Sequence, residues 1–120
     1  MGGHRKDSKM SDLKQVEVTI AETKKMITLA KTLEKLSTNK DFIAVMHEAY
    51  FKDEACRLVY LKADSQMAAP EHQLAIDRAI DAIGHTREFF RTIGQLGSMA
   101  EKSLEDHENT RDELQAEELN

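Results

Sequence analysis

Apolar side chains recur at helical spacing through the first third of this chain. Intervals of three, four and seven residues separate the members of one set, which are Leu13, Val16, Ile20, Ile27 and Ala30. A second, overlapping stripe consists of Met26, Leu29, Leu33 and Leu36. Such intervals place side chains on one face of an α-helix. We therefore predict a helix from about Asp12 to Leu36, with Ser11 as its N-cap.

A second helix is predicted from about Lys40 to Ala63, after the turn sequence "STNKDF", in which Thr38 or Asn39 can cap it. Its inward positions are predicted to be Phe42, Val45, Met46 and Ala49, then Ala55, Cys56, Val59 and Ala63, with Leu58 alongside. The adjacent aromatic residues Tyr50 and Phe51 lie between these stripes, and Asp53 can act as a new N-cap. We expect a bend or restart near Phe51, with one aromatic ring buried and the other available to a partner.

The third helix is predicted to run from Pro70 toward Leu114, because proline suits the first turn of a helix. A seven-residue repeat continues through it at Ile76, Ile83, Phe90, Gly97 and Leu104, and three residues further on at Ala79, Thr86, Ile93 and Ala100. This spacing is typical of a coiled-coil seam. Gly94 and Gly97 allow close approach of another backbone, or a break before a capping box at Ser98 and Glu101. The unbroken repeat favours a continuous or kinked helix.

These elements predict an all-α fold, an antiparallel three-helix bundle made of a helix-turn-helix hairpin and the long third helix. Short connections make successive helices antiparallel neighbours. We divide the chain into a flexible N-terminal leader (1–10), a helical bundle domain (11–106) and an acidic C-terminal tail (107–120). The tail is expected to be frayed or disordered unless a partner orders it.

Composition agrees with a helical fold, since the 120 residues include only one proline, five glycines and 5% aromatic residues. Charge is uneven: nine basic and five acidic residues lie in 1–40, six and nine in 41–100, and two and eight in 101–120. This distribution disfavours a nucleic-acid-binding protein. It allows a basic arm, charge-complementary contact between protomers, or simply solvated helix surfaces. No apolar run is long enough to span a membrane.

The segment "HEAYFKDEACRLVYLKAD" holds the single cysteine, Cys56, together with His47 and several acids. No histidine has another histidine or the cysteine three or four residues away, and the metal patterns H-E-x-x-H and E-x-x-H are absent. Glycine-rich phosphate loops and G-x-S-x-G turns are absent too. We therefore predict no enzyme activity, no metal and no cofactor, and we expect Cys56 to lie in the apolar core.

Four short motifs resemble a group of small all-helical proteins of tailed bacteriophages, which have unassigned functions and are found among structural and assembly genes. The motifs are Asn39–Phe42, Tyr50–Val59, Leu61–Asp64 and Ile83–Thr92. The resemblance covers roughly residues 33–106 and leaves the N-terminal leader outside. It implies a helical fold, a phage origin and a role in the virion or its assembly. It supplies no catalytic residues.

The expected function is that of a non-enzymatic virion or assembly protein, located in the virion or the host cytoplasm. Its expected partners are copies of itself and other phage structural proteins, without membrane or nucleic acid. The alternative is a small phage regulator that binds and inhibits a host protein. The residues expected to carry the interaction are Tyr50, Phe51, Ile83, Phe90, Gly94 and Gly97.

Overall fold

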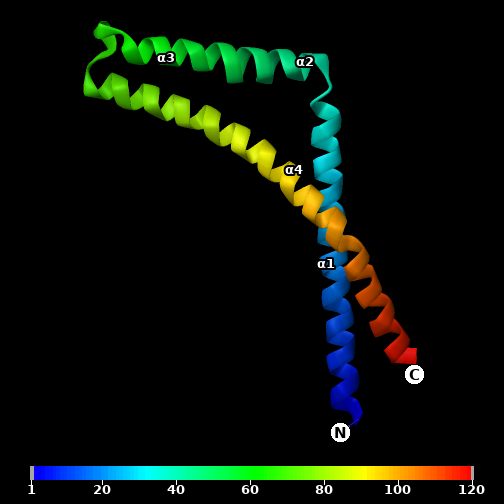
Figure 1. Cartoon of the computed structure of the whole chain (residues 1–120). Coiled ribbons are helices and arrows are strands. Elements are labelled where there is room, and N and C mark those ends of the chain that lie inside the picture. Colours follow the sequence, from blue (N-terminus) through cyan, green and yellow to red (C-terminus); the bar gives the residue numbers. More distant parts are fainter. Residues whose placement is uncertain (1, 120) are drawn as a thin grey trace. The chain divides into compact units, whose positions relative to one another are not determined.

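The structure is a computed structural model that describes residues 2–119, with side chains from Met10 onward. In chain order its elements are α1 (Gly2–Leu36), α2 (Lys40–Phe42), the π-helix η1 (Ile43–Glu54), α3 (Ala55–Ala63), the 3₁₀-helix η2 (Ser65–Met67) and α4 (Pro70–Leu119) (Figure 1). No strand occurs within residues 2–119. The predicted all-α class is confirmed.

The chain forms two compact units, which we describe separately. Unit 1 joins the two ends of the sequence, Met1–Thr32 and Ile93–Asn120. Unit 2 is the continuous segment Leu33–Thr92. The division into leader, bundle domain and tail stays a prediction, although the backbone of residues 2–10 and 107–119 is helical.

The ends of the long helices differ from those predicted. Helix α1 begins at Gly2 rather than near Asp12. Helix α4 continues to Leu119 rather than ending near Leu114, and it includes residues of the tail (107–120) that was predicted to be frayed or disordered. The prediction of a single third helix without a break at Gly97 is correct, because α4 is one element from Pro70 onward. The spacing of apolar residues predicted the central parts of these helices. It could not predict their ends, because the residues that extend the helices are mostly polar.

Side chains and backbone groups fix the connections of unit 2. The Asn39 side-chain oxygen Oδ1 accepts hydrogen bonds from the backbone N–H groups of Asp41 (2.9 Å) and Phe42 (3.0 Å), which makes Asn39 the N-cap. Ala69 ends the next connection. Its carbonyl oxygen accepts hydrogen bonds from the backbone N–H groups of His72 and Gln73 in the first turn of α4. The predicted cap at Asn39 is therefore confirmed, and so is the predicted start of the third helix at Pro70.

Between α2 and α3 the chain winds as a π-helix, in which each turn holds more residues than an α-turn. Buried and half-buried positions consequently recur every four residues, at Phe42, Met46, Tyr50, Glu54 and Leu58. The predicted inward stripes assumed the α-helical period and were wrong at Val45, Ala49, Cys56, Val59 and Ala63, all of which are exposed. The winding changes after Glu54 without a side-chain cap, so Asp53 does not restart the helix.

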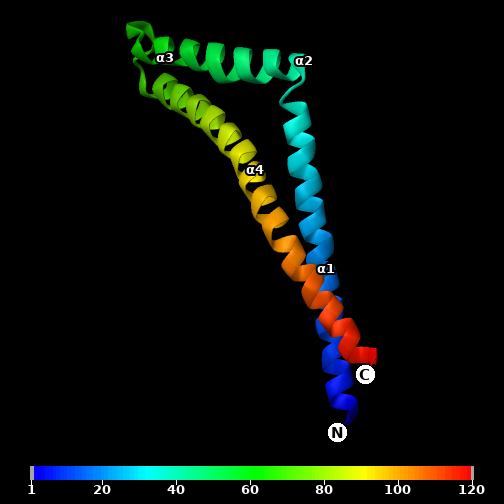
Figure 2. The ribbon, with the colours of Figure 1, turned by 45° about the vertical axis from the view of Figure 1, so that its right-hand side comes forward.

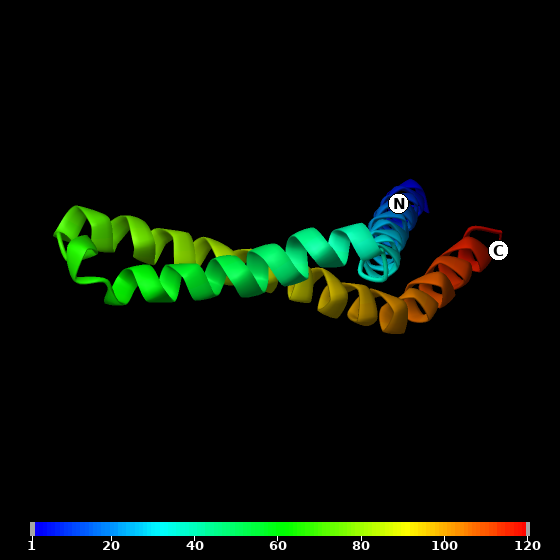
Figure 3. The ribbon, with the colours of Figure 1, turned by 90° about the horizontal axis from the view of Figure 1, so that it is seen from above.

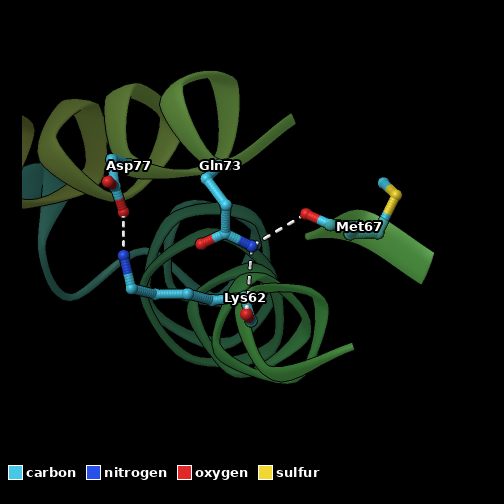
Figure 4. Close-up of polar contacts among 4 residues, drawn as sticks. All are labelled: Lys62, Met67, Gln73 and Asp77. Atoms are coloured by element: carbon cyan, nitrogen blue, oxygen red, sulfur yellow. Dashed lines mark hydrogen bonds and ion pairs between the residues drawn. The ribbon is translucent and has the colours of Figure 1, made fainter. Parts of the chain in front are cut away.

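The core of unit 2 lies between the helical run 40–63 and the first part of α4, which run side by side in Figure 3. Leu58, Ile76 and Ile83 are its buried centre, and half-buried apolar side chains pack around them. Polar contacts close the far end: Lys62 pairs with Asp77, and the Gln73 amide donates to the carbonyl oxygens of Lys62 (3.1 Å) and Met67 (2.8 Å) (Figure 4).

In unit 1, α1 meets the C-terminal part of α4, and Figure 2 shows this pair turned from the view of Figure 1. Ile20, Ile93 and Ala100 are buried there. A β-carbon added to Gly97 would lie 2.2 Å from the Cβ of Ala30, whereas one added to Gly94 would meet nothing within 4 Å. The predicted close approach of a backbone is thus found at Gly97 and not at Gly94.

Candidate interaction surface

Aromatic side chains gather where the helical run 40–63 faces α4 in unit 2. The ring centroid of Phe51 lies 5.6 Å from that of Tyr50, 5.5 Å from that of His47 and 6.1 Å from that of Phe90. Phe42 extends the cluster, with its ring 5.9 Å from Phe90. The rings are tilted or edge-to-face, which are favourable arrangements for aromatic pairs. The cluster therefore joins both elements through Phe51 and Phe90.

The structure brings together four of the six residues predicted to carry the interaction. Tyr50, Phe51 and Phe90 share the aromatic cluster, and Ile83 belongs to the adjoining core. Tyr50 and Phe51 are both half-buried, so the expected contrast between a buried and a free ring is absent. Gly94 and Gly97 lie on α4 within unit 1. Contact of these residues with another chain stays a prediction.

A groove of about 230 Å³ lies next to the aromatic cluster. It is lined by Phe51, Ala55, Val59, Ile80, Ile83, Gly84 and Arg87. Gly84 leaves one wall open, because a β-carbon at this position would meet nothing within 4 Å. The lining is mostly apolar, so the groove is suited to an apolar side chain from outside unit 2.

One arginine, Arg87, stands at the rim of this groove. The Arg87 guanidinium carbon lies 6.0 Å from the centroid of the Phe51 ring, within the range of a cation–π contact. No carboxylate among residues 10–119 forms an ion pair with Arg87. One turn further on, the Arg91 guanidinium donates to Glu88 at 2.6 Å and remains exposed. Arg87 thus gives the rim a positive charge that a carboxylate can approach, whereas the charge of Arg91 is already paired with Glu88.

Sequence reasoning did not single out Gly84 or Arg87 as part of a site. The available signal was a glycine inside a helical repeat, which costs about 1 kcal/mol relative to alanine. Arg87 gives no such signal, because its neighbour Phe51 is far away in the sequence and only the fold brings the two together.

An ion pair on the helical run 40–63 joins the half-buried Glu54 to the exposed Arg57. Arg57 Nε donates to Glu54 Oε2 at 2.9 Å. This hydrogen bond lowers the pKa of Glu54 and raises the pKa of Arg57, and the attraction between their charges acts in the same directions. The pair therefore favours the charged form of both side chains.

Histidine, cysteine and acidic side chains are scattered over the described part of the chain. Within residues 10–119, no three histidine, cysteine or acidic side chains come together in a way that could hold a metal ion. Cys56 is exposed, which corrects its predicted place in the core. In unit 1, Asp12 and His107 line one open groove of about 480 Å³, mainly with uncharged neighbours. Among the described helices, none is both long and apolar enough to cross a membrane.

Comparison with known proteins gives this chain no relative: no family model, no curated protein and no solved structure matches it.

Proposed function

We propose that this protein is a non-enzymatic assembly protein that acts through helix–helix contacts with copies of itself. The supporting observation is that many apolar side chains lack cover. In unit 2, Val45, Val59, Tyr60, Leu74 and Phe89 are exposed, and in unit 1, Val18, Leu29, Leu96 and Met99 are exposed. No side chain within residues 10–119 is completely buried. Exposed apolar side chains in such numbers favour a protein that completes its packing with a partner.

Burial of this surface would supply the driving force for assembly. Each Å² of apolar surface removed from water contributes about 25 cal/mol. In this proposal the three predicted helices form an antiparallel bundle. The exposed residues next to Ile83, Phe90 and Gly97 contact the next chain. Ile83 is itself buried, so the exposed residues beside it make the contact.

The proposed setting is a bacteriophage virion or the host cytoplasm in which the virion is assembled. The four sequence motifs that resemble phage structural and assembly proteins support this setting, and other structural proteins of the same virion are the proposed further partners. Regulation of a host protein remains the alternative. Both functions need a contact surface, and they differ in where the protein is found.

Light scattering of the purified full chain over a range of concentrations tests self-assembly. We expect the average mass to rise with concentration, and a mass that stays at 13.6 kDa would contradict the proposal. Mass spectrometry of purified virions then separates the two settings. A fixed copy number per particle supports the virion role. Absence from particles, together with stoichiometric capture of one host protein, supports the regulator.

A further inference from the structure

We propose that the groove beside Gly84 receives the acidic C-terminal helix end of a second copy of this chain. The inference rests on the proposed self-assembly and names the two surfaces that meet. It assigns a binding role to Gly84 and Arg87, which stand on neighbouring turns of α4, and to Leu119 at the end of the same helix.

The groove is apolar in its depth and open at Gly84. Ile83 is 5% exposed and belongs to the core, so it forms part of the floor. Val59 is 60% exposed and stands at the edge, where an incoming side chain would cover it. Because Gly84 has no side chain and nothing of the chain lies within 4 Å of its missing β-carbon, a partner can approach the helix backbone there.

The positive rim selects an occupant that carries carboxylates. Arg87 lies over the Phe51 ring, which orients its guanidinium and leaves its N–H donors available. Arg91 stands one turn further along α4, and its exposed guanidinium is paired with Glu88. A carboxylate that binds Arg87 would form charge-assisted hydrogen bonds, which are stronger than neutral ones.

The end of this same chain has the matching chemistry. Residues 101–120 contain eight acidic and two basic residues. Leu119 is 88% exposed, the highest exposure of the large apolar side chains described, and Glu118 precedes it. An apolar side chain beside a carboxylate fits an apolar groove beside an arginine. Charge complementarity of this kind also speeds association.

The groove and the acidic helix end are different surfaces, so the contact is heterologous. Each copy that offers its C-terminal end still has a free groove for another copy. Heterologous contacts of this type build rings or open filaments rather than closed twofold dimers. Copies that bind in this way would all point in the same direction along the ring or filament.

A mixing experiment with two full-length variants tests the contact. In the first variant, Gly84→Leu fills the groove and Arg87→Glu reverses the charge at its rim, while the tail is unchanged. The second, Leu119→Asp, keeps the groove and removes the apolar anchor of the tail. We expect each variant alone to self-associate about tenfold or more weakly than the unmodified chain. Mixed together, they should form a 1:1 heterodimer that does not grow further, observed by sedimentation velocity.

Two measurements keep folding apart from binding. Gly84→Leu places its side chain in open space and replaces a helical glycine, so the circular dichroism and melting temperature should be unchanged or higher. Arg78→Glu makes the same charge change on an exposed residue of α4 outside the groove, and self-association should remain at the level of the unmodified chain.

The possible outcomes separate this inference from the proposed function. An unmodified chain that stays monomeric at every concentration overturns both. An unmodified chain that assembles while both variants assemble equally well overturns the inference alone. A mixture that stays monomeric, or that grows beyond a dimer, overturns it as well. Binding by an acidic peptide of unrelated sequence as tightly as by a peptide of residues 105–120 would show a general acidic-peptide site and contradict the second-copy assignment.

Discussion

Ala30 and Gly97 lie so close in unit 1 that a β-carbon on Gly97 would stand 2.2 Å from the Cβ of Ala30. The Ala30 Cα would be 3.7 Å and the Met26 carbonyl oxygen 3.8 Å from the same atom. Backbone atoms as well as a methyl group therefore surround the position, and neither can rotate away. The missing side chain at Gly97 is what permits this approach of α1 to α4.

Gly97→Ala should destabilise unit 1 even though alanine is the better helix former. The gain in helix propensity is about 1 kcal/mol, and overpacking costs about 1–3 kcal/mol, so we expect a net loss of up to about 2 kcal/mol. Gly94→Ala is the matched control, since its methyl group meets open space and should add about 1 kcal/mol. Urea unfolding followed by circular dichroism measures both changes.

Ala30→Gly in the Gly97→Ala background should recover part of the lost stability, because it removes the atom that the new methyl group meets. The double-mutant cycle should therefore give an interaction free energy of about 0.5 kcal/mol or more. If Gly97→Ala stabilises the protein as much as Gly94→Ala does, the close approach is wrong.

Leu58→Ala and Val59→Ala test which face of the helical run 40–63 is buried. Leu58 is 3% exposed at the centre of the unit 2 core, and its truncation should cost about 2–5 kcal/mol. Val59 is exposed, and its truncation should change stability by no more than about 0.5 kcal/mol. Equal losses at the two positions would mean that the winding of η1 and α3 differs from the one described.

The sequence was a good guide where one regular period held. The seven-residue repeat of α4 predicted buried or half-buried positions from Ile76 to Leu104, and every position of the predicted seam has that burial. The same reasoning placed Cys56 and Val59 inward and was wrong, since a π-helix shifts the face of every residue after it. The contact between Arg87 and Phe51 could not be predicted from the sequence, because the two residues are far apart in it and only the fold brings them together.

Asn39→Ala should remove the side-chain acceptor at the start of α2. Two backbone N–H groups, those of Asp41 and Phe42, would then lose their partner in the protein. The expected cost is about 1 kcal/mol of unfolding free energy. Asn39→Asp should retain the cap, since its carboxylate accepts the same hydrogen bonds and favours the positive end of the helix. Thermal melts of the three proteins decide the question, and a loss equal in both variants would rule out the cap.

The exposed position of Cys56 predicts that its thiol reacts in the folded protein. Ellman's reagent should modify one thiol per chain without denaturant, at a rate close to that in urea. Cys56→Ser should leave the unfolding free energy within about 0.5 kcal/mol of the unmodified value, as is usual for exposed positions. A thiol that reacts only after unfolding would restore the core placement that the sequence suggested.

Glu54→Gln should reveal a pH-dependent contribution to stability. The pKa of Glu54 is lowered by the Arg57 hydrogen bond, so the unfolded chain binds a proton more readily than the folded one. The contribution is therefore present above the unfolded pKa of about 4.3, and it is lost as the pH falls through the lower folded pKa. The stability difference between the unmodified chain and Glu54→Gln should be largest near neutrality and shrink in acid.

The division of the chain into two units also sets the order in which they can fold during synthesis. Unit 2 is one continuous segment, so its helices can pair while the ribosome is still making the rest of α4. Unit 1 needs both ends of the sequence, and α1 emerges long before the residues that will cover it. Until residues 93–120 have been made, α1 lacks the segment with which it forms unit 1. A product that ends before Ile93 would keep the whole segment of unit 2 and leave α1 without its partner in unit 1.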